Sequence, residues 1–187
     1  MPAELGLPDG FVISSAAFSD ADVQQAIAAL QAEYVIRYGG IDESLSDPSD
    51  VEPPRGAFFV GRLDGVLVAT GAWRRSDVVA LGSAATVEIK RMYVDAAVRG
   101  RGLARAMLAH LEKHAAANGA EVVVLETGVR QPEAMALYAS SGYVEVPGFG
   151  HYKDSPLSRC FAKRVGRVAR EGEPVSRGVR RAGECDA

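Results

Sequence analysis

The stretch from Val98 to Leu108, VRGRGLARAML, joins glycines and arginines to the start of a predicted helix. The first turn of a helix leaves backbone N–H groups without partners, and the helix dipole is positive at that end. Gly100 and Gly102 would let a ligand approach those N–H groups closely. Positive charge would come from the neighbouring arginines, Arg99, Arg101 and Arg105. The pattern predicts a site for a phosphate or diphosphate.

Two common phosphate-binding motifs fit this stretch poorly. A P-loop needs Lys and then Ser or Thr after its last glycine, but Leu103 and Ala104 stand there. A dinucleotide-binding fingerprint would need a glycine in place of Arg105, although Glu126 in the next strand keeps a nucleotide-binding oxidoreductase as an alternative. The preceding stretch VEIKRMYVD is half polar, whereas the first strand of such a unit is normally buried on both faces.

The residues resemble more closely the GNAT superfamily of acetyl-CoA-dependent N-acetyltransferases. Its pyrophosphate loop reads Arg or Gln, two residues, Gly, one residue, then Gly or Ala, and RGRGLA at residues 99–104 follows that pattern. Its second signature resembles QPEAMALYASSGY at residues 131–143, with Gln131 in place of Asn and Tyr143 in place of Phe. The resemblance implies an α/β (α+β) GNAT fold, in which helices flank a mixed, mostly antiparallel sheet and splayed strands hold an acyl-CoA.

The resemblance further implies transfer of the acetyl group of acetyl-CoA to a primary amine by direct attack, with no metal. The strand before the loop would hold the pantetheine arm through Met92, Tyr93 and Val94, and Gln131 would assist. The loop would bind the diphosphate through Arg99, Gly100, Arg101, Gly102, Leu103 and Ala104. A degenerate member that binds acyl-CoA as a sensor or interaction module is the alternative to an enzyme.

Two residues correspond to catalytic groups of the family. Tyr138 matches a tyrosine that protonates the departing thiolate, and its alternative is a core aromatic residue. Glu88 corresponds to a general base of some relatives, and its alternative is a solvated strand carboxylate. Because Glu88 lies six residues before Val94, regular strand alternation predicts both side chains on one face.

The acceptor amine stays undetermined among an antibiotic, a polyamine, an amino acid and a protein terminus. The family holds its acceptor with the segments that correspond to residues 21–55 and 146–158. They offer Tyr34, Arg37 and Tyr38, together with Asp42, Glu43, His151 and Tyr152. The acidic residues would suit a cationic amine, whereas Arg37 would suit a carboxylate.

Other groups favour plainer interpretations. His110 and His114 are one helical turn apart, but no third ligand accompanies them, so we predict no metal site. Cys160 is expected to be a buried apolar residue. The arginines after Val165 are diluted by acidic residues and lack interleaved aromatics, which argues against nucleic-acid binding.

The elements that position these residues follow from local patterns. Strands are predicted at 11–18, at 85–95 and at 121–127, with two more at 143–146 and 158–165. Asp64 and Gly65 predict a tight hairpin between two further strands, and a second turn is predicted near Gly82 and Ser83. Helices are predicted from Ser19 or Asp20 to Tyr38, from Leu103 to Asn118, and from Pro132 to the glycine at 142. The acidic, proline-rich stretch 41–55 predicts a surface loop or lid.

Length and composition fit one domain. With 187 residues, 48% hydrophobic residues and a net charge of -3, the chain can bury a core and has no strong nucleic-acid footprint. We expect an extension at 1–10, the acetyltransferase domain at 11–165 and a disordered tail at 166–187. The N-terminus lacks a signal-peptide pattern, no apolar run would span a membrane, and the cysteines form no framework. These features predict a cytoplasmic protein, and the choice between a monomer and a homodimer stays open.

Overall fold

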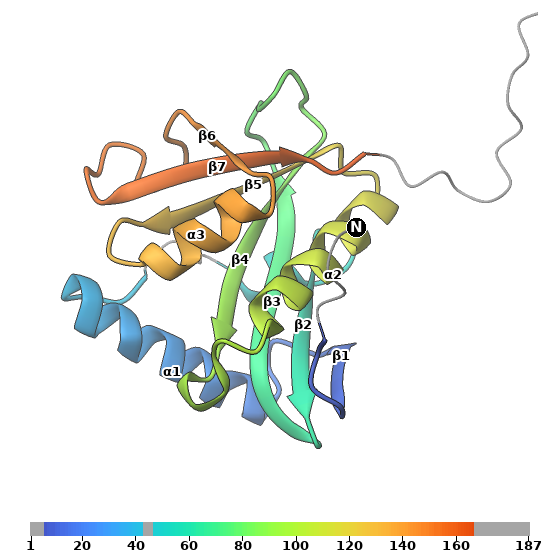
Figure 1. The fold of residues 1–187 in the computed structure, drawn as a ribbon. Helices are drawn as coiled ribbons and strands as arrows, with labels where there is room; N and C mark the ends of the chain where they lie inside the picture. The colour runs from blue at the N-terminus through green and yellow to red at the C-terminus, as the bar shows by residue number, and fades with distance from the viewer. Residues whose placement is uncertain (1–5, 43–46, 167–187) are drawn as a thin grey trace, which may run out of the picture.

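The computed structural model describes residues 6–42 and 47–166, which form a seven-stranded sheet with helices on both faces (Figure 1). The strands are β1 (Phe11–Ser15), β2 (Gly56–Leu63), β3 (Val66–Ser76), β4 (Thr86–Val94), β5 (Val122–Gly128), β6 (Val144–Val146) and β7 (Ser158–Arg164). The helices are α1 (Ala21–Tyr38), α2 (Leu103–Ala117) and α3 (Pro132–Ser140), with short 3-10 turns η1 (Pro48–Val51) and η2 (Ala96–Val98). The expected mixed α/β class is confirmed.

The sheet order is β1-β2-β3-β4-β5-β7-β6, and β4 with β5 is the parallel pair among antiparallel neighbours. A dinucleotide-binding unit would instead require a sheet of consecutive parallel strands with crossover helices. The topology therefore overturns the oxidoreductase alternative.

Most local predictions are confirmed. Asp64 and Gly65 have φ angles of 50° and 83°, which is the geometry of the expected tight hairpin turn. Gly39 ends α1 in the left-handed region. Two boundaries differ, because β1 ends at Ser15 rather than Phe18 and the stretch predicted as a loop at 41–55 contains η1.

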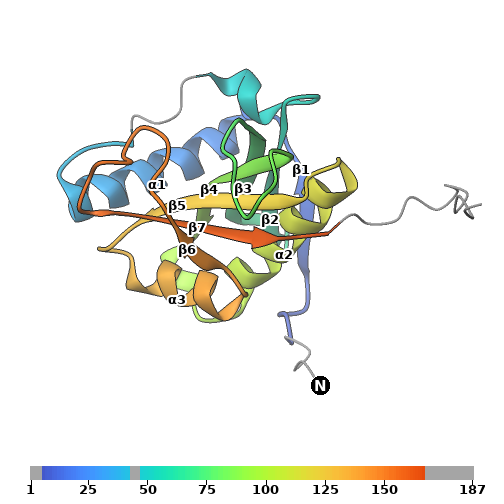
Figure 2. The same ribbon diagram turned by 90° about the horizontal axis from the view of Figure 1, so that it is seen from above.

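The helix α1 lies on one side of the sheet, and α2 and α3 lie on the other (Figure 2). Each face of the sheet carries a hydrophobic cluster. On one face α1 packs Val23 and Ile27 against the β2 side chains Phe58 and Val60. On the other face α2 buries the predicted stripe of Leu103, Met107, Leu108, Leu111 and Ala115. Burial of these side chains fixes both helices and so fixes the loop between β4 and α2.

β4 and β5 separate part-way along their length. They pair from Thr86–Val122 to Ile89–Leu125, and no further pair follows. At the same level β4 contains a bulge, since Arg91 has a φ of 56° and the register against β3 shifts between Thr70 and Ala72. The expected splay is therefore present, and the separated strand ends frame a gap in the sheet.

The bulge corrects one prediction. Regular alternation would place Glu88 and Val94 on the same face, but the extra residue reverses the alternation between them. Val94 packs in the core on the α2 side. Glu88 pairs instead with Arg74, which also contacts Asp50 of η1 on the α1 side. The shared face predicted for Glu88 and Val94 is wrong.

The expected tail at 166–187 lies, apart from Gly166, outside the described residues, as do Glu43 and the first half of the expected extension at 1–10. Within the part of the chain that the structure describes, no helix has the length and apolar character needed to cross a bilayer.

Candidate functional site

The gap between β4 and β5 opens into a cavity of about 370 Å³ that reaches the glycine turn before α2, here termed the loop cavity. Its walls include most residues predicted to bind the donor, namely Met92, Tyr93, Val94, Arg99, Gly100, Gly102, Leu103, Ala104 and Gln131. Arg101 is exposed and lines no part of it. The predicted donor residues thus converge on one cavity although they come from β4, α2 and the start of α3.

The glycine turn presents the start of α2 to the loop cavity. Gly100 and Gly102 have φ angles of 78° and 80°, a conformation that favours glycine, and Gly102 is the N-cap of α2. A Cβ at Gly100 would meet nothing within 4 Å, so the backbone here borders open space. The N–H groups of the first turn have no helical acceptors and carry the positive end of the helix dipole. This cradle fits a diphosphate.

Two arginines around the turn, Arg99 and Arg105, are already engaged with protein groups. The Arg99 Nε donates to the Val94 carbonyl oxygen at 2.9 Å, and its guanidinium pairs with Glu33 of α1. Arg105 donates to the hydroxyls of Ser140 and Ser141 at 2.7 and 3.0 Å, which joins α2 to the end of α3. Arg99 therefore connects the turn to α1, while Arg105 connects α2 to α3.

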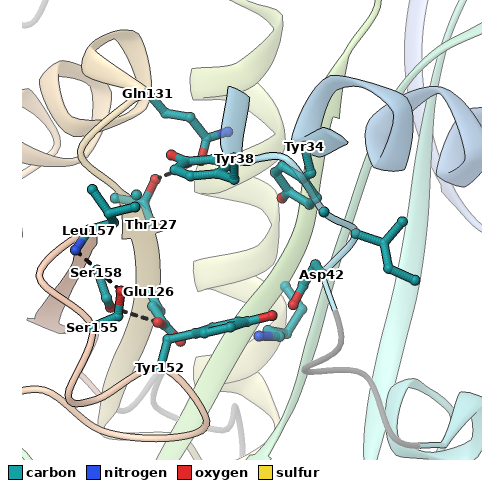
Figure 3. Close-up of a pocket in the computed structure, with 14 residues that line it drawn as sticks. Tyr34, Tyr38, Asp42, Glu126, Thr127, Gln131, Tyr152, Ser155, Leu157 and Ser158 are labelled. Atoms are coloured by element: carbon teal, nitrogen blue, oxygen red, sulfur yellow. Dashed lines mark hydrogen bonds between the residues drawn. The ribbon is translucent and has the colours of Figure 1, made fainter. Parts of the chain in front are cut away.

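A second cavity of about 280 Å³, the tyrosine cavity, lies at the end of α1 (Figure 3). In Figure 3, Tyr34 and Tyr38 stand on one side of the hollow and Tyr152 lies across from them. The remaining walls are Gly40, Ile41, Asp42, Lys90, Glu126, Thr127, Gly128, Gln131, Ser155, Leu157 and Ser158. Both cavities share Tyr34, Asp42, Lys90, Glu126, Thr127 and Gln131, so they meet at the separated ends of β4 and β5.

Glu126 stands at this junction and was not predicted as a site residue. Its Oε1 accepts a hydrogen bond from the Ser158 hydroxyl at 2.6 Å. Burial raises the pKa of Glu126, and this effect outweighs the lowering by the Ser158 hydrogen bond and by the charge of Lys90. Its signal in the sequence is an acidic residue that interrupts the otherwise apolar run of β5.

Glu88, the predicted general base, lies outside both cavities. Its carboxylate is buried, and its Oε2 accepts from the Arg74 Nε and Nη2 at 3.0 and 2.8 Å. The Lys90 ammonium is 3.3 Å from Glu88 Oε1. Glu88 lines neither cavity, so the structure does not bring it to the predicted site. It is a buried partner in an ion-pair cluster rather than the solvated carboxylate of the alternative.

Tyr138 lines the loop cavity from α3 and is 6% exposed. Its ring also packs against Tyr143 and Phe161, with centroids 5.7 and 6.2 Å away. Burial raises the pKa of the Tyr138 hydroxyl to about 12. The residue thus combines the packing of its alternative interpretation with a phenol at the cavity wall.

Some of the predicted substrate residues line the tyrosine cavity, and others line neither cavity. Tyr34, Tyr38, Asp42 and Tyr152 line the tyrosine cavity. Arg37 and His151 line neither cavity. Arg37 donates to the Arg130 carbonyl oxygen and pairs with Glu133 at 2.5 Å, which ties the end of α1 to the start of α3.

The histidine pair and Cys160 have packing roles. His114 Nδ1 lies 3.0 Å from the Trp73 indole N–H, which donates to it, and both histidine rings pack edge-on against Phe59. Over residues 6–42 and 47–166, no three His, Cys, Asp or Glu side chains cluster as metal ligands would. Cys160 is 2% exposed in the core, as predicted.

Residues 24–143, well over half of the chain, match the sequence profile of the Acetyltransferase (GNAT) family. The chain belongs to this family. It is 33% identical over 126 residues to an IAA acetyltransferase from Azospirillum brasilense, which covers 67% of this chain and 79% of that protein. It is 31% identical over 125 residues to the N-acetylaspartate synthetase of Homo sapiens, covering 64% of this chain but 40% of that protein.

Solved structures agree with this membership. The fold matches the crystal structure of a Klebsiella pneumoniae protein described as an acyl-CoA N-acyltransferase, with a TM-score of 0.67 and 30% sequence identity. The match covers 83% of this chain and 97% of that one. The resemblance inferred from the two motifs and the predicted GNAT fold are therefore confirmed. The chain is an enzyme of the N-acyltransferase class, and the geometry above is that of a GNAT protein.

Proposed function

We propose that the protein transfers the acetyl group of acetyl-CoA to the primary amine of a small acceptor by direct attack. The observation that carries this proposal is the meeting of two cavities at the separated ends of β4 and β5. The loop cavity has the diphosphate cradle, so it would hold the donor. The tyrosine cavity would hold the acceptor, and the two reactants would meet beside Glu126 and Lys90.

The donor would be held along β4 and the glycine turn. The N–H groups at the start of α2 would bind its diphosphate, with Arg99 as a counter-charge. The backbone of Met92, Tyr93 and Val94, which has no β5 partner, would bind the pantetheine arm. Gln131, whose Oε1 accepts from the Thr127 hydroxyl at 3.3 Å, would border that arm at the junction.

We assign the general base to Glu126 rather than Glu88. Glu88 is held by Arg74 and Lys90 outside both cavities, whereas Glu126 lines both. A carboxylate with a raised pKa is a better proton acceptor than an exposed one. Glu126 would take the proton of the acceptor ammonium, and the neutral nitrogen would then attack the thioester carbonyl carbon. The C–N bond forms as the C–S bond breaks, and the sulfur leaves as thiolate.

Tyr138 would face the departing sulfur and stabilise it. A thiol has an ordinary pKa of about 8.5, so complete proton transfer from a phenol of pKa about 12 is uphill by about 5 kcal/mol. The Tyr138 hydroxyl would therefore act chiefly as a hydrogen-bond donor to the developing thiolate. This refines the role of general acid that the family resemblance implies.

The test combines binding and turnover. Acetyl-CoA should bind in calorimetry, and thiol release should appear with amines from a panel. Because deprotonated Glu126 is the active form, kcat/KM should rise with pH through the pKa of Glu126, which burial holds above its usual range. Glu126→Gln should lose this acid limb and about 100-fold in kcat/KM.

Glu88→Gln is the matched control, since it removes a carboxylate from the same region of the sheet. It should keep the acid limb of the pH profile. Loss of the limb in Glu88→Gln and its retention in Glu126→Gln would reverse the assignment. Acetyl-CoA binding without thiol release from any amine would favour the sensor or interaction module instead.

A further inference from the structure

The walls of the tyrosine cavity restrict the body of the acceptor. Tyr34 and Tyr38 stand with ring centroids 6.4 Å apart, and Tyr152 lies on the opposite side (Figure 3). Ile41 and Leu157 add apolar surface. Aromatic faces bind flat rings and attract ammonium groups. A volume of about 280 Å³ is just below the usual range for ligand sites and suits a body of one ring.

The charged groups at the tyrosine cavity restrict the choice of acceptor further. Arg130 lies over the Tyr38 ring but lines neither cavity. Lys90 lines the cavity and Arg91 lies beside it at Asp42, and each has a carboxylate partner within the protein. Lys90 lies 3.3 Å from Glu88 Oε1, and the buried Arg91 guanidinium lies 3.0 Å from Asp42 Oδ2. Both cations are thus compensated before any ligand arrives. A ligand carboxylate would have to compete with Glu88 or Asp42 for its counter-charge, at a cost in desolvation.

Glu126 differs from these carboxylates. Its described contact is the Ser158 hydroxyl, and no cation among the described residues forms an ion pair with it. An incoming ammonium would add an ion-pair partner for Glu126 at the junction of the two cavities, where Lys90 already contributes a more distant positive charge. The site is therefore complementary to a cation, and Lys90, the cation among the described residues that line it, is already paired with Glu88.

We propose that the acceptor is a primary amine on a single aromatic ring without a carboxylate, that is, an arylalkylamine rather than an amino acid. This inference rests on the proposed function, because it assumes that the tyrosine cavity is the acceptor site. It also separates the chain from an aspartate acceptor, which carries two carboxylates.

The proposal can be tested with pairs of acceptors, an amine and its amino acid, that differ only in the carboxylate. The pairs are tyramine with L-tyrosine and phenethylamine with L-phenylalanine, with L-aspartate as a further acceptor, all measured by thiol release at saturating acetyl-CoA. We expect kcat/KM to be at least about tenfold higher for each amine than for its amino acid. Equal or better use of the amino acids, or of aspartate, would overturn the proposal while leaving the acetyltransferase function intact.

Binding separates this inference from the proposed function. Calorimetric titration of tyramine and tyrosine into the protein with CoA should show the same preference even if turnover is absent. Failure of acetyl-CoA to bind would sink the proposed function. Equal binding of tyramine and tyrosine, or binding of neither, would overturn the acceptor class.

A variant tests the charge argument directly. Glu88→Gln keeps the shape of the side chain but releases Lys90 from its carboxylate partner, so the preference for tyramine over tyrosine should fall at least about fivefold. Glu121→Gln is the control, because Glu121 bonds Ser83 and lines neither cavity. An unchanged preference in a Glu88→Gln protein that melts like the parent would refute the role of the Lys90–Glu88 pair.

Discussion

Gly128 allows the Tyr38 phenol to close one wall of the tyrosine cavity, and replacing it tests that wall. A Cβ added at Gly128 would lie 2.0 Å from the Tyr38 Oη and 2.5 Å from its Cζ. Ordinary contact begins near 3.4 Å, so in Gly128→Ala the phenol must retreat by about 1.4 Å. We expect a loss of about 2 kcal/mol in the free energy of unfolding, equivalent to a fall in Tm of about 4–8 °C.

The same movement should weaken acceptor use. The KM for the acceptor should rise several-fold, because Tyr38 lines the tyrosine cavity, whereas the Kd for acetyl-CoA should not change, because Gly128 does not line the loop cavity. Gly40→Ala is the matched control, since Gly40 lines the same cavity and an added Cβ meets nothing within 4 Å.

A double-mutant cycle tests whether the effects of Gly128→Ala arise from the clash with Tyr38. In a Tyr38→Ala background the clash no longer exists, so Gly128→Ala should cost almost nothing further, and the two changes should be strongly non-additive. Thermal denaturation and acceptor kinetics of the four proteins measure this. Additive effects would show that Gly128 is needed for another reason, and the reasoning about the wall would fail.

Three further predictions concern the donor side and the buried charges. Tyr138→Phe should lower kcat by about tenfold or more with little change in the Kd for acetyl-CoA, and the parent should show no basic limb from Tyr138 below about pH 11, since its pKa is about 12; an unchanged kcat would remove it from the mechanism. Asp42→Asn should cost about 3–5 kcal/mol in urea denaturation, because the Arg91 side chain is 2% exposed and would lose its carboxylate partner, and adding Arg91→Met should restore part of that loss. Glu33→Gln should tighten acetyl-CoA binding by about twofold to fivefold at low salt, because it removes the carboxylate that competes with the diphosphate for Arg99, and high salt should abolish the gain; weaker binding would contradict this competition.

The donor half of the site could be predicted because its determinants are local in the chain. The glycines at 100 and 102, the N-terminus of α2 and the apolar stripe from Leu103 to Ala115 follow one another directly, so spacing alone places them. The hairpin at Asp64 and Gly65 is predictable for the same reason. Arg101 is the exception, since the direction of its side chain depends on which side of the turn faces solvent.

The acceptor half depends on contacts between distant segments. Glu126 reaches the site only because β5 separates from β4 at that level. The charge of Lys90 is compensated only because Glu88, two residues earlier on the same strand, pairs with it. The bulge at Arg91 has no local sequence signal, and without it the alternation argument for Glu88 gave the wrong face. Arg37 lines neither cavity, and its partner Glu133 is almost a hundred positions away in the sequence.

The bulge also makes β4 a strand of two halves joined out of phase. Thr86 to Ile89 pairs with both β3 and β5, while Met92 to Val94 has no β5 partner and lines the loop cavity. Deleting Arg91 would restore continuous alternation and leave Met92 and Val94 on the α2 side, whereas deleting a residue within either half, with the bulge kept, would reverse the faces of one half relative to the other. This strand should therefore tolerate a change of length at the bulge better than a change of length within either half.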